Sequence, residues 1–499
     1  MSVLILISVF IIATCSLIYE LLAGTLSSYL LGDSVLQFST VIGSYMFALG
    51  VGAWLSKYIE DKVGERFVQL EIALGLVGGL SATLLFLMFG ASTTGAFRFL
   101  LYAIVLIVGT LSGFEVPLLL RLLQDRVEFK DLVSQVLTLD YIGSLLASVL
   151  FPLILVPHLG LVRTSCLFGL VNLIVAVLFL RIFKVDPRRH FSLTLQAAVC
   201  FVILVATFVF AGRITSYSEE ALYADNIIIA KQSPYQRLIV TRKSDDIRLY
   251  LNNNLQFSSK DEYRYHEALV HPAITACPHP KEVLVLGGGD GMAVREILRH
   301  PEVEHITLVD LDPLMTKLFT DHELLANLNE HSFSSPKVTV INDDAFIWLS
   351  RQDKKFDVAI VDFPDPSNFS VGKLYSTTFY RILKAHLNPE GSAAVQCTSP
   401  MFARQSFWCI VHTIKSVGFA ARPYHIYVPS FGEWGYCLLT HKPVPTPSCS
   451  APKFLTDKIT LAMFDFPEDL KDIPAKVNYL HDQALVRYYD REWQAMMLQ

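Results

Sequence analysis

The sequence predicts two kinds of fold in one chain: an N-terminal all-α polytopic membrane domain, followed by a C-terminal α/β domain with a mostly parallel sheet. Three observations support this division. The 499 residues are 52% hydrophobic and only 17% charged, whereas soluble globular proteins carry about a quarter charged residues. Charged residues are scarce up to residue 212 and frequent after it. Beyond residue 276, short apolar strands alternate with helical segments, a pattern typical of parallel sheets with crossover helices.

Seven apolar segments in the first part are long enough to cross a bilayer, since a span needs about 20 apolar residues. They are residues 3–25, 36–57, 69–90, 97–120, 136–157, 162–184 and 191–212. The first has no small-residue cleavage site, so we interpret it as a transmembrane helix and not as a signal peptide. We therefore expect residues 1–212 to form a transmembrane domain of about seven helices in the cell membrane, with the lipid bilayer as a partner.

Glu20, Glu115 and Asp140 are carboxylates that fall within these apolar segments. Ionisable residues inside a membrane are costly and often functional. They are interpreted in two ways: as part of a cation path, or as groups paired with hydroxyls and backbone near the ends of the spans. The sequence leaves both interpretations open.

The second part divides into three by pattern. Residues 213–275 are β-rich, because ADNIIIAKQ, YQRLIVTR and IRLYLNNNLQF are rich in β-branched residues and separated by turns. Residues 276–445 hold the alternating α/β pattern, and residues 446–499 form a C-terminal helical extension. In the α/β region we expect strands at 282–286, 305–310, 338–341, 356–361, 391–397, 424–428 and 435–440. The expected helices there are 291–299, 313–320, 345–350, 375–386 and 402–417.

A glycine-rich turn follows the first of these strands, in EVLVLGGGDGMAVREIL. Gly287 and Gly289 allow a tight turn and the close approach of a ligand to the backbone, and Asp290 lies in the same turn. Asp310 ends the next strand, where an acid can accept hydrogen bonds from both hydroxyls of a ribose. The combination indicates an adenosine-containing ligand, which could be a dinucleotide or an S-adenosyl cofactor.

Acidic residues also end the third and fourth strands. A carboxylate at Asp343 or Asp344 could accept a hydrogen bond from an adenine amino group, although Asp344 would equally cap the helix that follows. Asp362 and Asp365 lie at the edge where open α/β sheets bind ligands. Two carboxylates suit a cationic amine, which they would bind and from which they would take a proton. The alternative interpretation of this pair is a solvated turn.

Taken together, the motifs carry a more specific resemblance. YQRLIV, LNNNLQFSSKDEYRYHE, HPAI, VLVLGGGDG, NDDAFIWL, FDVAIVDFPDP and LYSTTFY occur in this order over roughly residues 225–440. Together they resemble the spermidine synthase family of polyamine aminopropyltransferases, in its membrane-fused form. The resemblance implies a Rossmann-like domain of the S-adenosylmethionine-methyltransferase type, preceded by a small β-hairpin subdomain. It also implies transfer of an aminopropyl group from decarboxylated S-adenosylmethionine to a polyamine such as putrescine, giving spermidine and methylthioadenosine.

The resemblance implies roles for individual residues as well. The cofactor would be bound by Gln236, His266, Gly287, Gly289, Asp290, Asp310, Asp343 and Asp344. The amine substrate and the transferred group would be bound by Tyr265, Asp290, Asp365 and Gln256. Asp362 would be the general base, and no metal would be required. One departure concerns Phe363 and Pro364, which separate the paired aspartates where members usually have small or polar residues. Another is the lack of a carboxylate after strand 391–397, for which Tyr427 or Glu433 could compensate.

Two alternative functions remain open at this stage. One is a methyltransferase that uses ordinary S-adenosylmethionine, and the other is a membrane polyamine transporter or sensor with a degenerate enzyme domain. The net charge of −5 argues against nucleic acid as a partner. The family resemblance suggests a homodimer.

The side of the membrane is a point of conflict within the sequence. Basic residues such as Lys57, Arg121 and Arg188 gather in every second link between the apolar segments, and the positive-inside rule places such links in the cytoplasm. Seven spans would then leave residues 213–499 outside the cell. We nevertheless expect this part to be cytoplasmic, because its cofactor is made in the cytosol.

Overall fold

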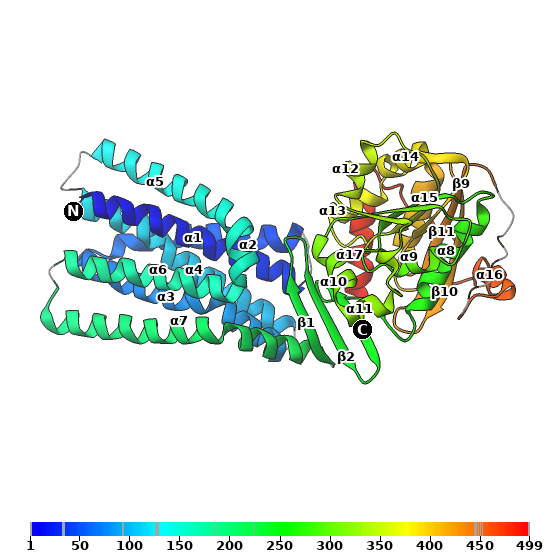
Figure 1. Cartoon of the computed structure of the whole chain (residues 1–499). Helices are drawn as coiled ribbons and strands as arrows, with labels where there is room; N and C mark the ends of the chain where they lie inside the picture. The colour runs from blue at the N-terminus through cyan, green and yellow to red at the C-terminus, as the bar shows by residue number, and fades with distance from the viewer. Residues whose placement is uncertain are drawn as a thin grey trace. The chain divides into compact units, whose positions relative to one another are not determined.

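The computed structural model describes residues 2–31, 35–91, 94–124, 129–183, 185–223, 225–443, 447, 449, 451 and 453–497. It divides into two compact units, residues 1–227 and residues 228–499 (Figure 1). We call them the helical unit and the sheet unit. The finer division into four parts remains a prediction, and its boundary at residues 445 and 446 lies outside the described residues.

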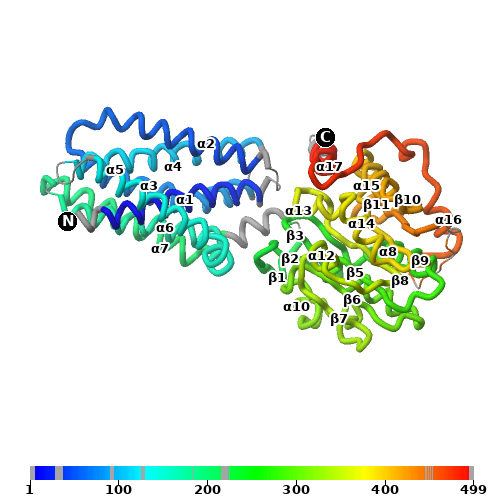
Figure 2. The backbone as a smooth tube through the Cα atoms, turned by 90° about the horizontal axis from the view of Figure 1, so that it is seen from above, coloured from blue at the N-terminus to red at the C-terminus, as the bar shows by residue number. Residues whose placement is uncertain are grey.

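Long apolar helices build the helical unit. They are α1 (Ser2–Leu31), α2 (Val35–Leu55), α3 (Val63–Ala91), α4 (Thr94–Leu123), α5 (Phe129–Leu150), α6 (Val156–Ile182) and α7 (Pro187–Leu222). Each apolar segment expected from the sequence coincides with one of them, and Figure 2 shows the helices lying alongside one another. Six stretches in the described residues are long and apolar enough to cross a membrane.

The fifth of these stretches, Lys130–Ile182, contains 53 residues. A continuous helix of that length would measure about 80 Å at 1.5 Å per residue, far more than a bilayer core of about 30 Å. The regular helix is interrupted by a π-helical turn at Phe151–Leu155 and by Gly160, whose φ is 74°. The stretch therefore contains two helices, α5 and α6, which Figure 1 draws as separate rods.

Glycines let the helices of this unit approach closely. A Cβ on Gly52 of α2 would lie 2.0 Å from the Thr110 carbonyl oxygen of α4, and one on Gly169 of α6 would lie 2.5 Å from the Gly75 carbonyl oxygen of α3. Such backbone contacts between small residues are typical of helices that pack in lipid.

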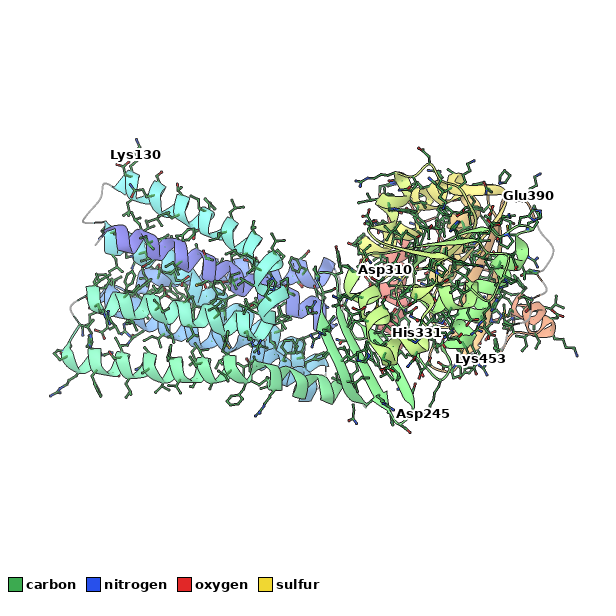
Figure 3. All side chains as sticks on the ribbon, viewed as in Figure 1. Lys130, Asp245, Asp310, His331, Glu390 and Lys453 are labelled. Carbon is green, nitrogen blue, oxygen red and sulfur yellow. The ribbon has the colours of Figure 1, made fainter. Side chains whose placement is uncertain are left out.

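The sheet unit begins with a small four-stranded sheet in the order β1-β2-β3-β4. Its strands are β1 (Asn226–Gln232), β2 (Arg237–Lys243), β3 (Asp246–Leu251) and β4 (Asn254–Ser258). Strands β2, β3 and β4 pair in antiparallel fashion. Figure 3 labels Asp245 at the β2–β3 hairpin.

A seven-stranded sheet forms the centre of the sheet unit, in the order β10-β11-β9-β8-β5-β6-β7. Its strands are β5 (Glu282–Gly287), β6 (His305–Asp310), β7 (Val338–Asn342), β8 (Phe356–Asp362), β9 (Leu387–Gln396), β10 (Ala420–Val428) and β11 (Gly432–Thr440). Strands β5 to β9 are parallel, and β11 joins β9 and β10 in antiparallel fashion. The predicted mostly parallel sheet is confirmed.

Helices cover this sheet and complete its hydrophobic core. They are α8 (Glu262–Ala276), α9 (Met292–Ile297), α10 (Pro313–Asp321), α11 (Glu323–Leu328), α12 (Ala345–Ser350), α13 (Phe369–Gly372), α14 (Thr377–His386), α15 (Arg404–Ser416), α16 (Asp457–Met463) and α17 (Ala484–Met497). Helix α8, which carries Tyr265 and His266, was not expected from the sequence. The C-terminal residues belong to the same compact unit as the sheet, and Leu485 of α17 is fully buried in its core.

Candidate functional site

The glycine-rich turn after β5 lies between the ends of the two neighbouring strands. Gly287, Gly288 and Gly291 have φ values of 80°, 65° and 76°, which L side chains rarely adopt. A Cβ on Gly287 would lie 2.2 Å from the Asp362 carbonyl oxygen, and one on Gly289 would lie 2.7 Å from the Asp310 carboxylate. Glycine is therefore required both for the turn and for the close approach of these two acids.

Asp310, labelled in Figure 3, ends β6 beside this turn. Its carboxylate accepts hydrogen bonds from the backbone N–H groups of Gly289, at 3.0 Å, and Asp312, at 2.9 Å. Burial raises the pKa of Asp310 to about 6, although these two hydrogen bonds act against the rise. Gln236 lies close by, because its amide donates to Asp312 Oδ2 at 2.9 Å.

Asp290 connects the acids of the turn electrostatically. It is 8% exposed, and its carboxylate accepts a hydrogen bond from the Met292 N–H at 3.0 Å. It interacts with Asp310 on one side and with Asp362 and His266 on the other. The structure thus brings together four of the residues that the sequence singled out.

The two acids after β7 have local partners. Asp344 caps α12 by accepting hydrogen bonds from Phe346 and Ile347, and its other oxygen lies 2.6 Å from Lys373 Nζ. Burial alone would raise the pKa of Asp344, but Lys373 and the capping bonds hold it below its usual value. One oxygen of Asp343 accepts a hydrogen bond from the Asp344 N–H at 2.8 Å, so its second oxygen keeps acceptor capacity for a ligand.

Asp362 ends β8 on the other side of the glycine turn. The Tyr265 hydroxyl of α8 donates a hydrogen bond to Asp362 Oδ1 at 2.6 Å. Burial raises the pKa of Asp362 to about 6, and Asp290 adds to the rise, whereas His266 and Tyr265 oppose it. A carboxylate with such a pKa is ionised at neutral pH and can still accept a proton, as a general base must.

Asp365 has one oxygen bound and one without a partner. Oδ2 accepts hydrogen bonds from the Tyr489 hydroxyl at 2.9 Å and the Thr398 hydroxyl at 3.3 Å. Oδ1 is buried and has no hydrogen-bond partner among the described residues. Burial raises the pKa of Asp365 to about 6. A buried acceptor without a donor is costly unless a ligand supplies one, so Asp365 is suited to bind an N–H group.

The turn between the two aspartates is held by a small polar network. Gln396 Nε2 donates to the Phe363 carbonyl at 2.6 Å, and the Tyr375 hydroxyl donates to the Pro364 carbonyl at 3.0 Å. Phe363 itself is 5% exposed and packs into the core. The unusual Phe-Pro pair therefore has a structural reason, and both aspartates start from a fixed backbone.

His266 belongs to a buried ionic network between α8 and α9. Its Nδ1 lies 2.8 Å from Glu262, which also forms two hydrogen bonds with Arg295, at 3.0 and 2.9 Å. Burial would lower the pKa of His266, but Glu262 raises it to about 9. His266 is therefore a cation at neutral pH. Its contribution to stability is complete below the unfolded-state pKa of about 6.5 and is lost as the pH rises through about 9.

We expect Arg295→Met to lower the free energy of unfolding of the sheet unit by about 3–5 kcal/mol, because Glu262 and Glu296 would stay buried without the guanidinium that donates hydrogen bonds to both. Arg299 forms a more exposed ion pair with Glu296, and Arg299→Met should cost about 1 kcal/mol or less. Chemical denaturation followed by tryptophan fluorescence measures both. Equal losses in the two variants would contradict the structural role of Arg295.

Gln256 forms a local contact. Its amide donates to the Asn254 carbonyl at 3.2 Å within β4, and its role in binding the substrate stays a prediction. Whether Tyr427 or Glu433 compensates for the missing carboxylate stays a prediction. Tyr427 is 56% exposed, and Glu433 forms a hydrogen bond with His425. Besides Thr398, Tyr489 of α17 reaches Asp365, and sequence patterns did not reveal this contact because Tyr489 lies 124 positions away.

Comparisons with known proteins show the family of the chain. The family model for the spermine/spermidine synthase domain matches residues 262–449. Polyamine aminopropyltransferase from Leptospira interrogans is 52% identical over 493 residues, which cover 98% of this chain and 99% of that protein. The chain belongs to the polyamine aminopropyltransferase family. Polyamine aminopropyltransferase 2 from Ralstonia nicotianae is 51% identical over 99% of both chains.

These family members match the chain over nearly its whole length, so the likeness includes the helical unit as well as the sheet unit. A solved structure of spermidine synthase in complex with the transition-state analogue AdoDATO is 24% identical, with a TM-score of 0.47, and covers 49% of this chain and 88% of that one. The match to the family model ends at residue 449, so Tyr489 lies outside it.

Proposed function

We propose that the chain transfers an aminopropyl group from decarboxylated S-adenosylmethionine to a polyamine such as putrescine, with spermidine and methylthioadenosine as products. Family membership supports the reaction type. The observation that carries the assignment to this site is the pair of acids at the end of β8: Asp362 held by Tyr265, and Asp365 with a buried oxygen that lacks a donor among the described residues.

The acids around the glycine turn suit the nucleoside substrate. Asp310 would accept hydrogen bonds from the ribose hydroxyls, Asp343 or Asp344 from the adenine amino group, and Asp290 from the ammonium of the aminopropyl group. Gln236 and His266 would contact the same substrate. The absence of side chains on Gly287 and Gly289 lets Asp362 and Asp310 lie directly against the turn where such a ligand would bind.

The acids of β8 suit the amine. An ammonium cannot attack a carbon, so it must first lose a proton, and Asp362 would accept that proton. The neutral nitrogen would then attack the methylene group next to the sulfonium; the new C–N bond forms as the C–S bond breaks, and the electron pair of that bond neutralises sulfur. Because positive charge disappears from sulfur, the site has to align the reactants more than to stabilise an anion. Asp365 would bind the amine and Tyr265 would orient it.

The product identity tests this proposal. The purified full chain is incubated with decarboxylated S-adenosylmethionine, or with S-adenosylmethionine, and a panel of di- and triamines, and the products are identified by mass spectrometry. We expect aminopropylated amine and methylthioadenosine with the first substrate. Methylated amine with the second substrate, and no aminopropylated amine with the first, would identify a methyltransferase and overturn the proposal.

Activity should depend on pH through Asp362. Since the pKa of Asp362 is raised to about 6 by burial, the fraction of active carboxylate rises with pH, and kcat should increase through about pH 6. Tyr265 lowers this pKa by its hydrogen bond, so Tyr265→Phe should move the acid limb of the profile to higher pH as well as reduce kcat. A profile of kcat from pH 5 to 8 measures both; an acid limb that stays in place in the variant would contradict the role of Tyr265.

Tyr489 should affect the amine and not the nucleoside. Tyr489→Phe removes the hydroxyl that donates to Asp365, and one such hydrogen bond is worth about 1–2 kcal/mol. We expect the KM for the amine to rise about 5- to 30-fold, with the KM for decarboxylated S-adenosylmethionine unchanged. Tyr488→Phe, on the same helix, is the matched control. Equal changes in both KM values would indicate a general disturbance of α17.

We propose further that the helical unit crosses the cell membrane several times, supported by its six long apolar stretches, and that the sheet unit is cytoplasmic, where its substrates are made. Seven helices and the basic links would place the sheet unit outside, so the two arguments predict opposite sides. Protease treatment of spheroplasts and of inside-out vesicles distinguishes them. Cleavage of the sheet unit in intact spheroplasts would contradict the cytoplasmic placement.

A further inference from the structure

Two carboxyl groups face each other inside the helical unit. Glu71 of α3 is fully buried and Glu115 of α4 is 2% exposed, and each interacts with the other. Within the described part of the chain, both oxygens of Glu71 and one oxygen of Glu115 have no hydrogen-bond partner, and no basic side chain there forms an ion pair with either. Glu115 was singled out from the sequence, whereas Glu71 was not.

Two further helices contribute polar groups without partners among the described residues, one and about two helical turns along α3 from Glu71. The Tyr19 hydroxyl of α1 is unpaired and interacts electrostatically with both carboxyl groups. Asn172 of α6 is fully buried, and neither atom of its amide has a partner. The Asn172 Cβ lies 3.4 Å from the point that a Cβ on Gly75 would occupy, one helical turn along α3 from Glu71.

Several other buried hydroxyl groups of the helical unit form hydrogen bonds within the protein, although those of Ser27 and Thr83 have no partner among the described residues. The Tyr45 hydroxyl donates to the Ser16 carbonyl at 2.9 Å, the Ser165 hydroxyl to the Gly79 carbonyl at 2.7 Å, and the Thr14 hydroxyl to the Phe10 carbonyl at 2.8 Å. Unpaired carboxyl groups are far more costly to bury than hydroxyls. The cluster of Tyr19, Glu71, Glu115 and Asn172 therefore offers acceptors to a ligand that supplies donors and positive charge.

We propose that this cluster, which we call the interhelical cation site, binds a primary alkylammonium ion between α1, α3, α4 and α6. An ammonium group has three N–H donors and no acceptor, which matches two carboxyl groups and one hydroxyl or amide oxygen. A metal ion is disfavoured, because the described residues contain no group of three or more His, Cys, Asp or Glu side chains that could hold one. The proposed reaction consumes and produces alkylammonium ions, and the choice of polyamines as the ligand rests on that proposed function.

Amine binding to the full chain in lipid nanodiscs tests the site. The Asp362→Asn/Asp365→Asn variant removes the amine site of the sheet unit, and equilibrium dialysis with radiolabelled putrescine and spermidine then measures what remains. We expect one saturable site per chain, lost when Glu71→Gln and Glu115→Gln are added. Glu65→Gln is the matched control: Glu65 lies on the same helix but pairs with Arg189 at 3.2 Å, so this change should leave binding intact.

Two further measurements keep the test independent of folding and of the transferase reaction. Glu71→Gln/Glu115→Gln in the otherwise unchanged chain should retain aminopropyl transfer, which shows that the sheet unit is folded. Tyr19→Phe, which removes a single hydroxyl, should weaken binding about 3- to 10-fold. The proposal would be overturned if no residual amine binding is found, or if binding survives in the Glu71→Gln/Glu115→Gln variant. Displacement of the amine by sodium but not by potassium at equal ionic strength would also overturn it.

Discussion

The Asp362→Asn variant should lose aminopropyl transfer almost completely, with kcat reduced about 100- to 10,000-fold, which is the usual contribution of a positioned general base. Asparagine preserves the shape of the side chain and can accept the hydrogen bond from Tyr265, but it cannot accept a proton. The KM values of both substrates should change little, because Asp365 and Asp310 remain. Steady-state kinetics at saturating concentrations of both substrates measure the loss.

Two controls make this result specific. Asp353→Asn changes an exposed aspartate just before the same strand and should leave kcat as it is. Raising the pH should recover part of the activity of Asp362→Asn, because the free amine becomes more abundant as the pH approaches the ordinary pKa of an amine. A variant that retains the kcat of the unchanged chain at neutral pH would show that proton removal occurs elsewhere.

The second large effect is expected at Asp310. Asp310→Asn should raise the KM for decarboxylated S-adenosylmethionine about 10- to 100-fold, because hydrogen bonds to a charged acceptor contribute about 1.5–3 kcal/mol each. The two carboxylate oxygens of Asp310 accept hydrogen bonds from the N–H groups of Gly289 and Asp312. An asparagine has only one acceptor oxygen, so its NH₂ group would face one of these two donors. Isothermal titration with methylthioadenosine measures the nucleoside affinity without the reaction.

The matched control for Asp310 is Asp321→Asn, at the exposed end of the following helix, which should bind methylthioadenosine as the unchanged chain does. The KM for the amine should also stay within about twofold in Asp310→Asn, because the amine is expected to bind at β8. An equal loss of affinity for both substrates would mean that the substitution collapses the glycine turn and does not act through the nucleoside.

The sequence predicted the parts of the molecule that depend on local patterns. Residues 358–361 of β8 form a continuous apolar run, so the strand and the position of Asp362 at its end followed from local composition alone. Asp344 was correctly expected to cap α12, since an aspartate before an apolar helix has that local role. The glycine turn was predictable because consecutive glycines between an apolar strand and a helix favour a tight turn with positive φ.

Contacts between distant segments were beyond such patterns. Tyr489 approaches Asp365 only because α17 packs against α13 and α15 of the sheet unit. No periodicity in α17 indicates that contact. The helix that carries Tyr265 was not expected, because its charged residues are typical of a polar surface segment. In the structure Glu262 is buried and forms an ion pair with Arg295. Glu71 lies within the predicted segment 69–90, but only the structure shows that it interacts with Glu115 of another helix.

A structure of the full chain with methylthioadenosine and putrescine bound is the most direct test of the proposed site. We expect the ribose hydroxyls on Asp310 beside the glycine turn, and one putrescine nitrogen within hydrogen-bond distance of Asp362. We also expect an N–H group of putrescine to meet Oδ1 of Asp365, the oxygen that is buried without a donor among the described residues. A nucleoside bound away from β5 and β6, or an amine that contacts neither aspartate of β8, would contradict the proposed site.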